Sequence, residues 1–172
     1  MKTKERYWIV VVSKDHTMRG VSGGFMQACH GKQAPLKRMS ENDWVIFYSP
    51  KISMGGEEKC QSFTAIGQAS DTDVYQYQMT KDFIPFRRNV KFYDCKQISI
   101  LPLIEKLDFI RDKQRWGFQF RFGFFEIKEH DFNLIASTML PDAKSGKLKQ
   151  AKRMSLNKTL FDTDVETCSI QP

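Results

Sequence analysis

Residues 7–13 are YWIVVVS, a run of apolar and mostly β-branched side chains. A short apolar run without alternation is typical of a strand that is buried on both faces, so it predicts a central strand of a sheet. A second buried strand is predicted at 44–49, WVIFYS, and Pro50 should stop it.

Further strands are expected near 61–69, 74–79 and 87–93. The strongest periodic signal is at 116–127, WGFQFRFGFFEI, where an aromatic side chain occupies every second position from Trp116. A period of two predicts a single strand with an aromatic inner face.

Short helices are expected between these strands. Asp15 should cap a helix that reaches Met18 and is broken by the glycines at 20, 23 and 24. The others are a helical turn from Pro35, a helix over 102–110 and a helix over 132–139 capped by Asp131. The elements together predict a mixed α+β domain around a curved, barrel-like sheet.

The charge is uneven along the chain of 172 residues, whose formal net charge is +7. Residues 141–172 hold six of the 27 basic and four of the 20 acidic residues, so the remainder keeps +5. We therefore expect one basic domain over 1–140 and a basic tail over 141–172, either weakly helical or disordered. A basic domain favours polyanionic partners, of which nucleic acid is the commonest.

Several classes are disfavoured by the sequence. No apolar run approaches the roughly 20 residues that span a bilayer, and the apolar run after the basic start is too short for a signal peptide, so we expect a cytoplasmic protein and no membrane partner. The four cysteines form no CxxC pair and the three histidines form no metal-binding pattern, so we expect reduced thiols, no metal and no cofactor.

The usual enzyme motifs are missing. There is no GxSxG elbow and no phosphate-binding GxxxxGK[ST] loop, and the glycines of GVSGGF at 20–25 do not have the dinucleotide spacing. A nucleophile assembled by folding stays open, with Cys29 beside His16 or His30. We expect a binding module and not an enzyme.

Recognition of a base requires an aromatic face, polar groups for the base edge and cations for the backbone. Phe25 follows two glycines and could offer its ring, although a loop aromatic is equally often packed into the core. Ser13 and Ser49 close the two apolar strands and could meet a base edge, or merely cap those strands. Arg121 lies between Gly117 and Gly123, and either faces a ligand or forms a salt bridge.

Other basic residues stand near the ends of the same strands. They are candidates for phosphate contacts: Lys32, Lys37, Arg38, Lys51, Arg87 and Arg88, with Lys14 and Arg19 nearby. The three tryptophans are more often core residues than ligand walls.

An ordered series of short motifs resembles one family. The motifs are YWIVVVS–DH at 7–16, GVSGGF at 20–25, HGK–APLKRM at 30–39, DWVIFYSPK at 43–51, FTAIG at 63–67, PF–RR at 85–88 and WGFQFRFGFFEI at 116–127. Over about residues 5–140 the chain is similar to EVE domains. This resemblance implies a PUA-like fold and kinship with YTH domains, which are readers of modified bases.

The resemblance also implies a pocket. Ser13, Lys14 and His16 would line it, and Phe25 would stand where YTH readers place a cage tryptophan. The second wall stays open between Trp116, Phe83 and Tyr75. Three functions remain: a reader of a modified or extruded base in DNA or RNA, a PUA-like binder of RNA or tRNA backbone, and a hydrolase that uses Cys29.

Overall fold

The computed structural model describes residues 4–140, so the expected tail at 141–172 lies outside the described residues. Within that range eight strands form one sheet: β1 (Tyr7–Val11), β2 (Phe25–Met26), β3 (Trp44–Lys51), β4 (Lys59–Ala69), β5 (Tyr75–Gln76), β6 (Phe86–Phe92), β7 (Ile98–Ser99) and β8 (Phe124–Ile127). The helices are α1 (Lys14–Gly23), α2 (Gln33–Lys37) and α3 (Glu129–Met139), with 3-10 helices η1 (Cys29–Gly31), η2 (Leu101–Lys106) and η3 (Trp116–Phe122).

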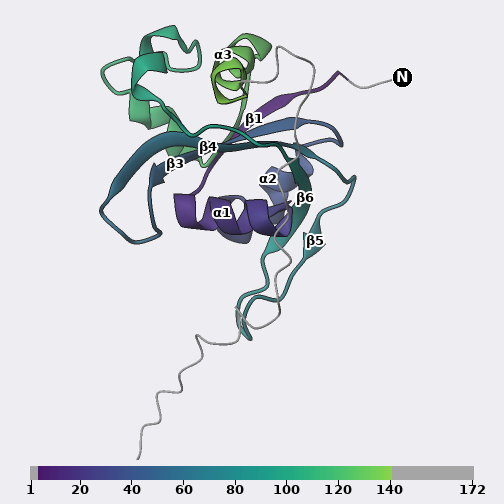
Figure 1. Cartoon of the computed structure of the whole chain (residues 1–172). Coiled ribbons are helices and arrows are strands. Elements are labelled where there is room, and N and C mark those ends of the chain that lie inside the picture. Colours follow the sequence, from purple (N-terminus) through teal and green to yellow (C-terminus); the bar gives the residue numbers. More distant parts are fainter. Residues whose placement is uncertain (1–3, 141–172) are drawn as a thin grey trace, which may run out of the picture.

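The sheet is mixed, with the order β2-β6-β4-β3-β1-β8, while β5 pairs with β6 and β7 pairs with β4. Only β1 and β3 are parallel among the described pairs; β8 runs antiparallel to β1. The sheet curls into a half-barrel, with α1 and α2 on one face and α3 on the other (Figure 1). The predicted fold class, a curved mixed sheet with short helices, is confirmed.

Two cores explain why β1 is apolar without alternation. Trp8 and Val10 belong to the core on the α1 side, whereas Ile9 belongs to the core on the α3 side. Both faces of the strand therefore bury apolar side chains. Each Å² of apolar surface removed from water stabilises the fold by roughly 25 cal/mol. On β3 the same alternation places Phe47 in the first core and Tyr48 in the second.

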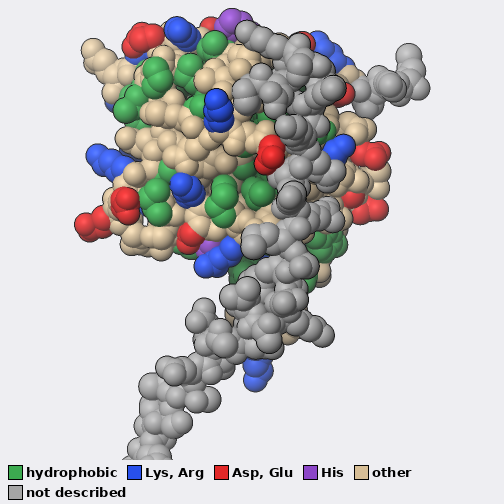
Figure 2. All heavy atoms as spheres, viewed as in Figure 1, with side chains coloured by type: hydrophobic (Ala, Val, Ile, Leu, Met, Phe, Trp, Pro, Cys, Tyr) green, Lys and Arg blue, Asp and Glu red, His purple; other side chains and the backbone are tan. Residues whose placement is uncertain are grey.

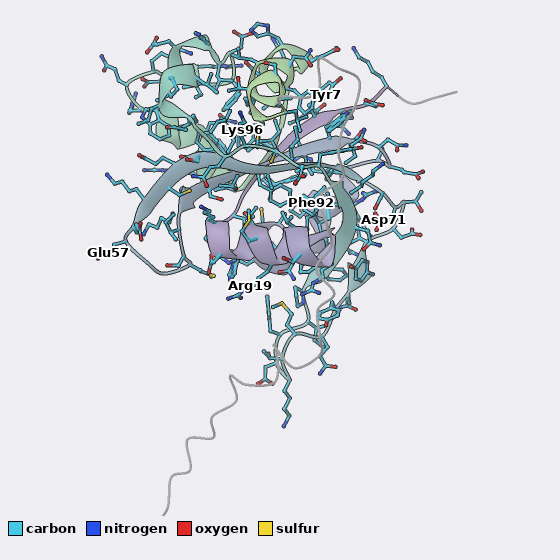
Figure 3. All side chains as sticks on the ribbon, in the orientation of Figure 1. Tyr7, Arg19, Glu57, Asp71, Phe92 and Lys96 are labelled. Atoms are coloured by element: carbon cyan, nitrogen blue, oxygen red, sulfur yellow. The ribbon has the colours of Figure 1, made fainter. Side chains whose placement is uncertain are left out.

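Figure 3 shows the two sides of the sheet through labelled side chains. Tyr7 lies on the α3 side, where it stacks on Phe132 with ring centroids 4.5 Å apart. Phe92 points into the layer between the sheet and α1, and Arg19 points from α1 away from the sheet.

The prediction that three glycines break the first helix is wrong. Gly20 and Gly23 lie inside α1, and the helix ends at Gly24 in the left-handed conformation, with φ of 71°. Gly20 permits a close approach, since a Cβ there would lie 2.7 Å from the carbonyl oxygen of Phe25. Gly20 thus serves packing, while Gly24 alone of the three glycines ends the helix.

The single strand predicted at 116–127 is also wrong. Its first part is η3, and only Phe124–Ile127 form a strand. Gly123 has φ of 71° and donates its N–H to the carbonyl of Phe120, which closes a tight turn before β8. Phe118 and Phe122 are 56% and 58% exposed, so the alternating aromatics do not form one buried face.

Asp131 does not cap α3, because the helix begins before it and Lys128 precedes the first turn. Its buried carboxylate instead accepts hydrogen bonds from the backbone N–H groups of Asp108 and Phe109. The other differences are small: the strand expected over 74–79 is only β5, and the helix expected over 102–110 is the 3-10 helix η2.

Two simple properties complete the description of residues 4–140. Among them no helix combines the length and the apolar composition needed to cross a bilayer. Cys29, Cys60 and Cys95 are free thiols, while Cys168 lies outside the described residues.

Candidate functional site

The parallel pairing of β1 and β3 brings the ends of both strands to one edge of the sheet. The N–H of Val12 donates to the carbonyl of Tyr48, and the N–H of Asp15 donates to that of Ile52. The start of α1 therefore lies beside the end of β3. This is the position where ligands commonly bind in sheets with parallel strands.

Two further segments join this edge. The N–H of Val11 donates to the carbonyl of Gly123 at 2.8 Å, so the chain leaving η3 returns onto the end of β1. On the other side β4 begins opposite β3, with Lys59 across from Lys51. We call the combined region the strand-end edge; it consists of residues 13–16, 49–51, 59–62 and 121–123.

The strand-end edge carries unpaired positive charge. Among residues 4–140 the salt bridges are Arg6–Glu126, Arg88–Asp71 and Arg115–Asp112, so no cation of this edge takes part in one. Lys51 and Lys59 are exposed and directly opposite each other, an arrangement that costs stability unless an anion lies nearby. Sequence reasoning missed Lys59, although its place at the start of a predicted strand could have indicated it.

The two predicted serines differ in availability. Ser49 is completely buried, and its hydroxyl lies 2.7 Å from that of Thr64 and 3.4 Å from that of Thr17. Ser49 is therefore a structural residue and cannot meet a ligand. The Ser13 hydroxyl is buried without a well-formed hydrogen bond, and it faces the carboxylate of Asp15.

His16 and Lys14 lie in the first turn of α1, as half-buried side chains at this edge. Asp15 is between them. Burial raises the pKa of the Asp15 carboxyl, but hydrogen bonds from Ser13, His16 and Met54 and the charge of His16 outweigh it, so the pKa is lowered. The edge thus combines a carboxylate with several cations.

Phe25 is not part of the strand-end edge. It follows the far end of α1, whose 10 residues span about 15 Å. The Arg87 guanidinium lies 3.7 Å from the ring centroid of Phe25 and 3.7 Å from that of Tyr77. The carboxamide of Gln27 is 2.8 Å from Nε of Arg87, a distance at which its oxygen accepts a hydrogen bond. The predicted slot beside Phe25 is therefore filled by the protein itself.

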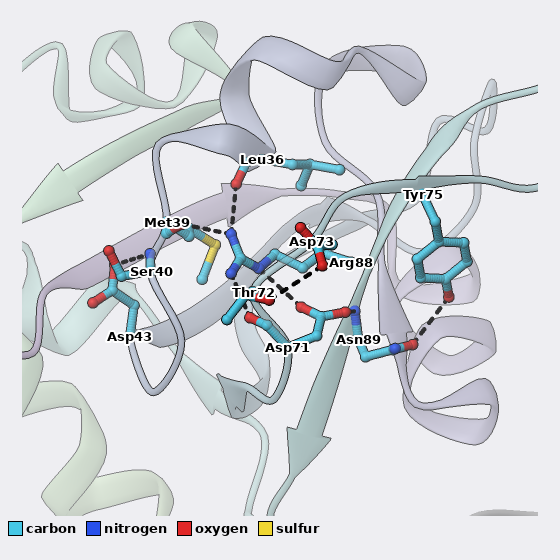
Figure 4. A network of polar contacts seen from close by, with 10 residues as sticks. All are labelled: Leu36, Met39, Ser40, Asp43, Asp71, Thr72, Asp73, Tyr75, Arg88 and Asn89. Carbon is cyan, nitrogen blue, oxygen red and sulfur yellow. Dashed lines mark hydrogen bonds and ion pairs between the residues drawn. The ribbon is translucent and has the colours of Figure 1, made fainter.

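Arg88, another predicted phosphate ligand, is fully buried (Figure 4). Its Nε donates to Asp71, its Nη1 donates to the carbonyls of Leu36 and Met39, and its Nη2 donates to the carbonyl of Asp71. All three guanidinium nitrogens of Arg88 therefore donate hydrogen bonds within the protein, and these bonds hold α2 and the residues after it against β6. We call Phe25, Asp71, Tyr77, Arg87 and Arg88 the arginine wall.

Arg87 cannot serve as an exposed phosphate ligand either, because it is only 7% exposed. Burial lowers the pKa of its guanidinium, while Tyr75 and Tyr77 oppose this shift.

The remaining predicted phosphate ligands reach solvent. Lys32, Lys37 and Arg38 are exposed around α2, although the Arg38 guanidinium also lies 4.9 Å from the ring of Trp8. On the face in Figure 2 the Lys and Arg side chains are separated by acidic and apolar groups. Positive charge on that face is therefore scattered and forms no continuous patch.

Trp116 and Arg121 are separated although both belong to η3. Trp116 packs edge-on against Phe120 and lines a groove of about 1300 Å³ between η3, the N-terminal segment and the start of α3. Arg121 is exposed and forms no salt bridge among residues 4–140; its guanidinium lies 5.9 Å from the ring of Phe118. Of the glycines flanking it, Gly123 is approached by the sulfur of Cys29, whereas Gly117 borders open space.

Two of the three residues suggested as a second wall, Phe83 and Tyr75, belong to the β5–β6 hairpin. Phe83 is 42% exposed and Tyr75 donates to Asn89.

Among residues 4–140, one group of side chains has metal-ligand chemistry: the possible ligand atoms of Asp108, His130 and Asp131 lie within 4.8 Å of one another. The Asp131 oxygens already accept hydrogen bonds from two backbone N–H groups. These bonds fix the segment at 108–109 against α3 and give the cluster a structural role.

The curled mixed sheet and its covering helices form a half-barrel. The EVE domain model matches residues 6–138, and the chain belongs to this family. It is 53% identical to a UPF0310 protein of Mycobacterium avium (strain 104), over 77% of this chain and 96% of that protein. It is 45% identical to the UPF0310 protein YdcG of Bacillus subtilis (strain 168), over 77% of this chain and 91% of that protein.

Two solved structures match most of the chain at low sequence identity. A hypothetical protein from Leishmania major gives a TM-score of 0.49 at 12% identity, over 84% of this chain and 98% of that chain. The protein Rpa0253 from Rhodopseudomonas palustris gives a TM-score of 0.45 at 13% identity, over 77% of this chain and 92% of that chain.

Proposed function

We propose that the protein is a nucleic-acid-binding module that receives an extruded base at the strand-end edge. The observation that carries the proposal is the convergence of the segments that hold Ser13, Lys14, Lys51 and Arg121 at one edge, where the three cations form no salt bridge among residues 4–140. Cations outside any described salt bridge, beside the buried Ser13 hydroxyl that faces Asp15, are suited to an anionic ligand with a polar flat part.

We propose Phe122 as the aromatic face, because its backbone belongs to this edge; its ring packs edge-on against Phe118, with centroids 5.9 Å apart, and lines the groove beside Trp116. Its ring is 58% exposed, and its carbonyl lies 3.9 Å from the Cys29 sulfur, beside the turn that returns to β1. A base stacked on an exposed ring gains about 1–3 kcal/mol. Phe122 replaces Phe25 as the proposed stacking residue, because Arg87 occupies the ring of Phe25.

Recognition of a modified base is the finer part of the proposal. Burial of one added methyl group contributes about 0.8 kcal/mol, so one aromatic wall would discriminate a methylated base only a few-fold. Extrusion from a duplex costs a few kcal/mol, so we expect single strands to bind more tightly than duplexes.

A role for Cys29 as a nucleophile is less well supported. Burial raises the pKa of this thiol, although Lys32 and Arg38 oppose the shift, and a nucleophilic cysteine needs the thiolate. Burial also raises the pKa of Cys95, to about 11. Binding without catalysis therefore remains the proposal.

The test is a fluorescence titration of short labelled single strands at several salt concentrations. Lys51→Ala should weaken the binding of all sequences alike and reduce the salt slope by about 0.7, the value for one lost phosphate contact to a single strand. Phe122→Ala should weaken binding by roughly tenfold at an unchanged salt slope.

The matched control is Lys96→Ala, which removes an exposed lysine on the α3 side of the sheet (Figure 3). It should leave affinity and slope nearly unchanged. Equal losses for Lys51→Ala and Lys96→Ala would mean that only general charge attracts the nucleic acid. Salt-insensitive, very weak binding by the wild-type protein would refute the proposed function.

A further inference from the structure

The strand-end edge contains a β-bulge in β4. Ser49 pairs with Ser62 and Lys51 pairs with Lys59, so Cys60 and Gln61 together stand opposite Pro50 alone. Gln61 has a φ of 46°, in the left-handed region. Bulges of this kind turn a strand and redirect a side chain, and they are frequent beside binding sites.

Glycine is the residue that usually takes the left-handed place of such a bulge. Glutamine has a Cβ that crowds its own carbonyl there, at a cost of about 1–2 kcal/mol. Neighbouring contacts hold this conformation: the Ser62 hydroxyl donates to the carbonyl of Cys60, and the N–H of Ile100 donates to the carbonyl of Gln61. The conformation is thus enforced by the fold and not by the preference of the residue.

No contact of the Gln61 carboxamide within residues 4–140 explains why a glutamine occupies this strained position. Its carboxamide makes no hydrogen bond to any residue between 4 and 140, whereas the neighbouring Ser62 hydroxyl does. The chain therefore keeps a strained, half-buried glutamine with a free donor and a free acceptor, next to unpaired lysines at 51 and 59. Strain of this kind at a surface edge is typical of binding sites.

We propose that Gln61 determines base specificity by hydrogen-bonding the polar edge of the extruded base. This inference rests on the proposed function and names the chemistry of its ligand. A carboxamide offers one donor and one acceptor side by side, which matches the amino group and adjacent ring nitrogen of adenine. The same pair of groups occurs on cytosine, so we expect preference for an amino-bearing base.

The experiment compares Gln61→Gly with Asn42→Gly. Asn42 also has a positive φ, of 69°, but it precedes β3 at the opposite end of that strand, about 25 Å from the strand-end edge. Glycine relieves the backbone strain at both positions, so both variants should fold with melting temperatures at or above that of the wild-type protein. Only Gln61→Gly removes the proposed specificity group.

The probes are short thymine-rich single strands with one central adenine, cytosine, guanine or thymine. The wild-type protein should bind strands with a central adenine or cytosine more tightly than those with guanine or thymine. Gln61→Gly should reduce this affinity ratio roughly tenfold. Its salt slope should stay unchanged, because the phosphate contacts remain. Asn42→Gly should keep both the preference and the slope. Gln61→Asn, which tolerates the same φ with a shorter amide, should also lose preference.

The outcomes separate this inference from the function on which it rests. Wild-type binding with base preference that Gln61→Gly and Gln61→Asn both retain would overturn the role of Gln61. Salt-dependent wild-type binding without any base preference would also overturn it, while leaving a backbone binder. Absence of wild-type binding would refute the proposed function itself.

Discussion

At the strand-end edge Lys51, Lys59 and Arg121 are exposed and form no salt bridge among residues 4–140, whereas in the arginine wall the guanidinium groups of Arg87 and Arg88 are enclosed by aromatic rings, a carboxylate and backbone carbonyls. Both regions had the same appearance in the sequence, as basic residues near strand ends. The comparison teaches that a cation is available to a partner only where the fold leaves its donors unused.

The largest expected effect breaks the arginine wall at Arg88. Arg88→Ala would leave the Asp71 carboxylate and the carbonyls of Leu36 and Met39 without their donor. Removing one partner of such a buried pair typically costs about 4 kcal/mol, which urea unfolding would measure. Arg88→Lys keeps the charge but not the planar fork, so its loss should be intermediate. An unchanged free energy of unfolding for Arg88→Ala would contradict the structural role.

A smaller effect is expected at Arg87, and it sharpens the assignment of the site. Arg87→Ala removes a guanidinium stacked on two rings and should cost about 1–2 kcal/mol of stability. It also empties the slot beside Phe25. If the base binds at the strand-end edge, the affinity for single strands stays the same. A gain in affinity for methylated strands would instead assign the base to the slot between Phe25 and Tyr77.

The smallest effect concerns Asp15 and the dependence of stability on pH. A pKa lowered by folding means that the ionised carboxylate stabilises the native state. This contribution is complete well above the ordinary value of 3.8 and disappears as the pH falls through the lower folded pKa. The melting temperature of the wild-type protein should therefore exceed that of Asp15→Asn at neutral pH, and the gap should close below pH 3.8. A gap that persists in acid would show that the effect is not ionisation.

The elements that could be predicted from the sequence are those whose pattern has one physical cause. The runs at 7–13 and 44–49 are apolar because both sheet faces are buried, and β1 and β3 lie there. The aromatic alternation at 116–127 misled because exposed Phe118 and Phe122 follow the same pattern as buried Phe120. No local signal distinguishes a buried ring from an exposed one.

The candidate site could be predicted only in part. Ser13, Lys14 and Lys51 converge because parallel strands end at the same edge, a consequence of the predicted sheet. The burial of Arg88 could not be foreseen, since its partner Asp71 and the carbonyl of Leu36 come from separate segments. Gln61 was missed because a positive φ at glutamine follows from the register of β3 and β4, which sequence patterns do not specify.

The position of β1 also has a consequence for synthesis on the ribosome. Trp8 pairs with Val45 on one side but with Glu126 on the other, so β1 emerges long before its partner β8 has been synthesised. Such distant pairing slows folding, because a long loop must close before the contact forms. A nascent chain that stops before β8 should therefore leave one side of β1 open to pairing with other chains.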